Sequence, residues 1–222
     1  MDIVVFNSKY WSEANKKGVT KEKLENVARQ AIQAASKLLP PLSPYLNITL
    51  QFSDEHGRMI EGRGFYAVTM SSEWVDLGID PNLPFGEEKT LHNLHVMLMH
   101  ECLHASRMYT LDQPYSPEPL RAAIEEGLSV NFEQNFSGEK VPWGQFEDDK
   151  TMQKWFDEIG KLPIDSKNYE YLFDHPDGRR WIIYKTGTWI IHKILANGKL
   201  KFNDLVKMPY QEILTEFEKL RV

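Results

Sequence analysis

The chain has 222 residues, of which 41% are hydrophobic, 12% aromatic and 26% charged, so it can bury a sizeable core. This composition excludes an intrinsically disordered chain, a collagen and a low-complexity linker. The 26 Lys and Arg against 32 Asp and Glu give a net charge of −6 without a basic cluster, so nucleic acid is not an expected partner.

The sequence also predicts where the protein resides. Its single cysteine, Cys102, has no partner for an intramolecular disulfide, which fits a reducing compartment. The first residues lack the basic segment and apolar run of a signal peptide. Apolar stretches such as 181–191, which contains Lys185, fall short of the roughly 18 residues needed to cross a bilayer. We therefore expect a cytoplasmic protein with no membrane span.

In the first half of the chain, hydrophobic periodicity predicts two helices and two strands. Apolar residues at helical spacing predict a helix over 20–39, which ends at two prolines. Alternation of apolar and polar residues predicts a strand over 46–52, ended by the turn residues 54–57, and a second strand is expected over 65–70. Residues 88–107 have the composition of a helix.

The second half is predicted to be mainly helical. Ser116 and Pro117 have the residue types of an N-cap and a first helical residue, so they predict a helix that extends to about Phe132 with an interruption at Gly127. A later helix is expected over about 179–197, closed by Gly198.

These elements predict one α+β domain. Residues 1–110 are expected to form an α/β half with a small mixed sheet, and residues 111–222 a mainly helical half. The sequence shows no internal repeat and no long flexible linker.

The sequence His100-Glu101-Cys102-Leu103-His104 is an H-E-x-x-H motif on the predicted helix 88–107. At about 100° per residue, His104 lies about 40° from His100 and one turn further on, so both imidazoles can reach one metal ion. Glu101, about 100° from His100, can hold a metal-bound water without being a ligand. Cys102 points away at about 200° and is expected to be a buried core residue.

A zinc site that performs chemistry keeps three protein ligands and one open position, so a third ligand is required. Candidates lie in the segment 124–129, which contains Glu125 and Glu126. Helical periodicity places Glu125 beside the apolar face of the helix and Glu126 about 100° further around the helix axis. It does not determine which of the two is the third ligand.

The H-E-x-x-H helix followed about 20 residues later by the segment Glu126-Gly127-Leu128-Ser129 resembles the gluzincin metallopeptidases. Among them it looks most like the small bacterial proteins described as predicted zinc-dependent proteases. The resemblance implies a thermolysin-like α+β core and a Zn²⁺ ion held by His100, His104 and Glu126, the last being the glutamate before the glycine. Ser129 departs from the family, in which alanine is usual at this position.

A second resemblance concerns residues 184–191, which are similar to a Y-x-x-G-[YW] segment of the same predicted proteases. Because a tyrosine or histidine of gluzincins donates to the oxyanion formed during peptide hydrolysis, the resemblance suggests Tyr184 for this role. The other candidates are His175, Arg179, Arg180 and His192. The family also implies a substrate-binding edge strand around 64–72.

These observations predict a zinc-dependent peptidase that acts on a peptide or protein substrate, with Glu101 as general base. Two alternatives remain: a zinc-binding regulatory or interaction domain with a vestigial peptidase site, and a domain whose two histidines never bind metal. The substrate, the choice between endo- and exopeptidase, and the oligomeric state are left open by the sequence.

Overall fold

The computed structural model describes residues 2–5, 11–52, 63–84, 88–114, 116, 118–164 and 168–221, with only the backbone for 11–13. Within these residues the fold is mixed α and β. The chain divides into two compact units, Met1–Pro114 and Tyr115–Val222. The division falls close to the predicted boundary between the α/β half and the helical half, and the prediction that the halves form one domain stays a prediction.

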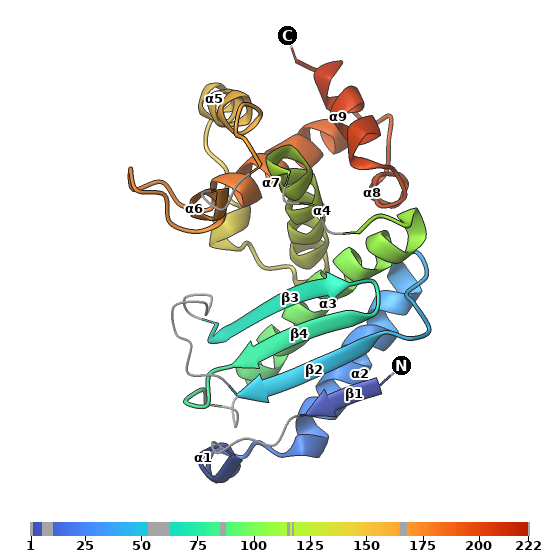
Figure 1. Cartoon of the computed structure of the whole chain (residues 1–222), viewed down its shortest axis with the longest axis vertical. Helices are drawn as coiled ribbons and strands as arrows, with labels where there is room; N and C mark the ends of the chain where they lie inside the picture. The colour runs from blue at the N-terminus through green and yellow to red at the C-terminus, as the bar shows by residue number, and fades with distance from the viewer. Residues whose placement is uncertain are drawn as a thin grey trace. The chain divides into compact units, whose positions relative to one another are not determined.

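Among the described residues, the first unit contains a four-stranded mixed sheet (Figure 1). Its strands are β1 (Asp2–Val5), β2 (Asn47–Phe52), β3 (Phe65–Ser71) and β4 (Trp74–Ile79), in the order β1-β2-β4-β3. β1, β2 and β4 run parallel, and β3 is antiparallel to β4. The small mixed sheet is therefore confirmed, and among the described strands β3 forms one edge.

Alternation along the strands explains how this sheet is covered. In β2 the apolar residues Ile48, Leu50 and Phe52 are buried, while the residues between them are partly exposed. Helices α2 (Lys21–Leu38) and α3 (Glu88–Leu111) cover the apolar face. One-sided burial of this kind follows from the two-residue period of a strand.

Two of the four strands were not predicted. In β4 the apolar residues Val75, Leu77 and Ile79 alternate in sequence with Asp76 and Gly78, although Gly78 is buried as well. The signal for β4 was therefore present in the sequence. β1 has only four residues, too few for a periodicity argument.

The two predicted helices of the first unit are confirmed. α2 begins after Thr20, whose side-chain oxygen accepts a hydrogen bond of 3.2 Å from the backbone N–H of Lys23. Such an N-cap satisfies one of the free donors of the first turn. α3 is longer than predicted, with 24 residues. A short helix, α1 (Trp11–Lys16), precedes α2, and the predicted turn at 54–57 lies outside the described residues.

The second unit is helical, as predicted. Its elements are α4 (Pro119–Ser137), the 3₁₀ turn η2 (Pro142–Gly144), α5 (Asp149–Ile159), α6 (Tyr169–Leu172), α7 (Ile182–Ala196), α8 (Phe202–Leu205) and α9 (Tyr210–Glu218). α4 and α7 form its central pair, and α5 and α9 pack against α7.

Two predicted helix starts were wrong. α4 begins at Pro119, because the backbone of Glu118 is still extended; Ser116 precedes the helix, and Pro117 lies outside the described residues. α7 begins at Ile182, three residues later than predicted, because Trp181 adopts a left-handed conformation with φ 55°. Its predicted end is confirmed, since Gly198 has φ 74° and stops the helix.

Gly127 does not interrupt α4, contrary to the prediction, because the helix continues through it. Its role is a close approach between α4 and α7. A Cβ atom on Gly127 would lie 2.2 Å from the backbone carbon of Gly187, and a Cβ atom on Gly187 would lie 1.7 Å from the carbonyl oxygen of Ala123. Neither position has room for a side chain, so the two glycines set the distance between the helices.

No helix in the described part of the chain has the length and apolar character needed to cross a membrane.

Candidate metal centre

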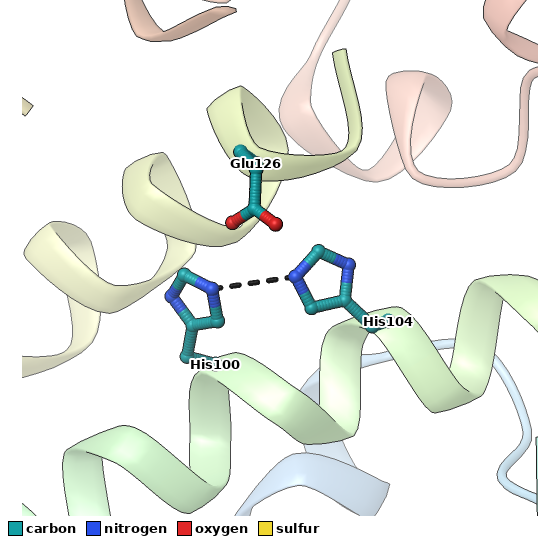
Figure 2. A group of neighbouring side chains, drawn as sticks. All are labelled: His100, His104 and Glu126. Atoms are coloured by element: carbon teal, nitrogen blue, oxygen red, sulfur yellow. Dashed lines mark hydrogen bonds between the residues drawn. The ribbon is translucent and has the colours of Figure 1, made fainter. Parts of the chain in front are cut away.

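The H-E-x-x-H residues lie in the buried middle of α3. His100, Glu101 and His104 are 6%, 5% and 9% exposed, respectively. The Nε2 atoms of His100 and His104 face each other at 3.3 Å (Figure 2). One turn of helix separates the two residues, so this arrangement is built by α3 alone.

The spacing of the two imidazoles fits a shared metal ion. In a tetrahedral zinc site with Zn–N bonds of about 2.0–2.1 Å, two ligand nitrogens lie roughly 3.3 Å apart. The 3.3 Å between the two Nε2 atoms agrees with this value. Both nitrogens can act as ligands when each ring carries its proton on Nδ1.

Glu126 of α4 completes a group of three possible ligands. One ligand atom from each of His100, His104 and Glu126 lies within 4.8 Å of the other two (Figure 2). Two imidazoles and a carboxylate make a donor set used by catalytic zinc sites. Among the described residues this group contains Glu126 and not Glu125. The structure therefore contains a cluster that could hold a metal ion, and ligation by each residue stays a prediction.

The helix pair α4 and α7 determines where the backbone of Glu126 lies. Gly127, the next residue, touches Gly187 of α7 with no room for a Cβ atom. The side chain of Asn131 donates a hydrogen bond of 2.7 Å to the carbonyl oxygen of Gly127. A glycine beside the candidate ligand thus allows α7 to approach α4 closely. The sequence favours a close helix approach at Gly127 but does not identify α7 as the partner helix.

Glu101 has a hydrogen-bond partner that the sequence analysis missed. The hydroxyl of Thr69, on β3, lies 2.7 Å from the Oε2 atom of Glu101 and 3.1 Å from its carbonyl oxygen. Thr69 is 7% exposed. A signal for it was present, because strand alternation places this polar residue on the same face as the buried Phe65.

Cys102, inside the motif, is fully buried. Burial, followed by the charge of neighbouring Glu101, raises the pKa of its thiol to about 12. A thiol that stays protonated at neutral pH is a poor zinc ligand, since zinc binds the thiolate. Cys102 is therefore a core residue, as predicted.

Tyr184, the predicted oxyanion donor, lies in the first turn of α7, and its carbonyl oxygen accepts a hydrogen bond of 2.8 Å from the hydroxyl of Thr188. Its role stays a prediction. The other candidates have partners of their own within the second unit. Arg179 binds both carboxylate oxygens of Glu158 at 2.7 Å, and this hydrogen bonding lowers the pKa of Glu158. The remaining pairs are His175 with Asp177, Arg180 with Asp174, and His192 with the ring of Phe146.

Most of the chain matches a known protein family. Residues 24–215 match the family described as "Predicted Zn-dependent protease (DUF2268)". The matched range contains both histidines, Glu101 and Glu126. No curated protein and no solved structure shows a significant match to the chain.

Proposed function

We propose that the chain, which belongs to the family of predicted Zn-dependent proteases (DUF2268), hydrolyses peptide bonds with a zinc ion held by His100, His104 and Glu126. The observation that supports this most strongly is the cluster of two buried imidazoles and one half-buried carboxylate. Because the third residue is a glutamate on a later helix, we propose that the site is of the gluzincin type.

When bound, zinc would lower the pKa of a coordinated water towards 7 and polarise the carbonyl of the scissile peptide. Glu101 is the candidate general base, since it follows His100 directly and is not one of the three clustered residues. Its carboxylate would accept the proton of the attacking water and then return it to the leaving amine. Its low exposure keeps bulk water from competing for the carboxylate.

The substrate class follows from the same proposal. β3 is an edge strand among the described residues, and an extended peptide could pair with its backbone by strand addition. A peptide or protein substrate suits such an edge. The thermolysin-like arrangement of the core and the cytoplasmic location stay predictions.

We expect the purified protein to contain close to one zinc ion per chain. Glu126→Ala should lower zinc affinity by at least ~100-fold, because loss of a ligand should exceed the ~10–100-fold effect of losing an outer-shell partner. Glu125→Ala is the matched control, since it removes the neighbouring carboxylate of the same helix. Zinc affinity is measured by competition with a chelator of known affinity, and zinc content by elemental analysis.

The reverse order of the two variants would assign the third ligand to Glu125. Zinc well below half occupancy in the parent, with no increase after zinc is added at neutral pH, would contradict the metal site.

Tyr184→Phe tests the proposed oxyanion donor. Loss of one donor to an oxyanion typically lowers kcat by about 10²–10³-fold. The substitution removes one oxygen atom, so zinc content and thermal stability should be unchanged. Steady-state kinetics on a cleaved peptide measures the effect, with Tyr171→Phe as control, because the Tyr171 hydroxyl is engaged with Glu158. Parental kcat in Tyr184→Phe would show that this tyrosine is not the donor.

A further inference from the structure

The hydroxyl of Thr69 donates a hydrogen bond to the side chain of Glu101. The hydroxyl oxygen lies 2.7 Å from Oε2 of Glu101 and 3.1 Å from the carbonyl oxygen of the same residue. A hydroxyl has one proton to donate, and an ionised carboxylate is a stronger acceptor than a carbonyl. The proton of Thr69 is therefore directed at Oε2, which also has the shorter distance.

The strand around Thr69 is irregular at this point. Pairing of β3 with β4 is regular from Phe65 as far as Thr69, which is opposite Val75, and then shifts so that Ser71 is opposite Trp74. Such a shift bends the strand and changes the direction of nearby side chains, and bulges are frequent beside active sites. The irregularity begins at the residue that contacts Glu101.

We propose that Thr69 is a positioning residue for Glu101, a role that rests on the peptidase function proposed above. A glutamate has three rotatable side-chain bonds, and a carboxylate must sit within hydrogen-bond reach of the proton it accepts. Thr69 fixes Oε2 from the β3 side and so reduces the orientations open to the carboxylate. The edge strand thereby supplies a side chain that orients the general base.

The test compares Thr69→Val, which has nearly the same shape without the hydroxyl, with Thr69→Ser, which keeps the hydroxyl. Thr69→Val should lower kcat by ~10–100-fold, the range typical for loss of an outer-shell partner in a metal site, with KM and zinc content unchanged. Thr69→Ser should restore kcat to within about threefold of the parent, because serine offers the same donor. A residue that serves only packing would show the opposite preference, since valine fills the space better than serine.

A second measurement does not depend on activity. Crystal structures of the parent and Thr69→Val are compared for the orientation of the Glu101 carboxylate. In the parent we expect one orientation of the carboxylate, with Oε2 hydrogen-bonded to Thr69. In the variant we expect the carboxylate to be displaced or to occupy more than one conformation. If the valine variant does not fold, Thr69→Ala replaces it in both measurements.

Parental kcat in Thr69→Val, or an unchanged Glu101 orientation in its crystal structure, would overturn the proposal. If the parent itself shows no peptidase activity, the proposed function fails, and the crystallographic comparison still decides whether Thr69 positions Glu101.

Discussion

Glu101→Gln is expected to remove nearly all peptide hydrolysis while zinc binding stays at the parental level. The amide has the size of the carboxylate and cannot accept the proton of the attacking water, and loss of a general base typically costs about 10²–10⁴-fold in rate. Glu101 lies beside His100 but outside the cluster of possible ligands, so zinc affinity should not change. Because Thr69 donates to the carboxylate, the variant's amide should be oriented with its oxygen towards the Thr69 hydroxyl.

Hydrolysis is measured on a broad library of unstructured peptides, because the preferred sequence is unknown. Glu88→Gln is the matched control, since it makes the same chemical change at an exposed position in the first turn of the same helix. A chelator-treated parent sample gives the background rate.

This comparison also separates an enzyme from a regulatory domain. A zinc-binding domain with a vestigial site would bind zinc equally in the parent and in Glu101→Gln, and neither would cleave peptides. A zinc-loaded parent that cleaves nothing in the library above the chelated background would therefore count against the peptidase proposal and favour that alternative.

Gly187→Ala is expected to destabilise the second unit strongly. The new Cβ atom would lie 1.7 Å from the carbonyl oxygen of Ala123, which belongs to the backbone of α4 and cannot turn aside. Overpacking of a core typically costs about 1–3 kcal/mol, and a clash with backbone belongs at the upper end or beyond. A loss of about 3 kcal/mol would lower Tm by roughly 6–12 °C in a chain of this size. Calorimetry measures the change.

Gly187→Ala should also weaken zinc binding. The new side chain must push α4 away from α7, and Glu126 is next in the chain to Gly127, which contacts Gly187. Gly160→Ala is the control: Gly160 has φ −66°, which suits alanine, and its nearest neighbour would lie 3.3 Å from the new Cβ atom. That variant should change Tm far less than Gly187→Ala does. Equal Tm values for the two variants would show that the glycine contact does not limit the approach of the helices.

Local patterns in the sequence were sufficient to predict part of the fold and part of the candidate site. The pair His100 and His104 follows from helical geometry over one turn, so its orientation could be worked out before the fold was known. The helix over 20–39 and the strand over 46–52 follow in the same way from periodicity and from the prolines and turn residues that end them. The prediction of Glu126 as the third ligand came instead from a family resemblance. Helical periodicity allows either Glu125 or Glu126 to face a partner helix, so it does not decide between them.

Other features depend on residues far apart in the chain, and only the tertiary structure determined them. Thr69 and Glu101 are 32 residues apart, and their hydrogen bond requires β3 to lie beside α3. Gly127 looked like a helix interruption, yet its contact is with Gly187 on another helix. The edge position of β3 follows from the pairing of β4 with both β2 and β3. Periodicity reports which face of an element is buried, but it does not identify the element that covers that face.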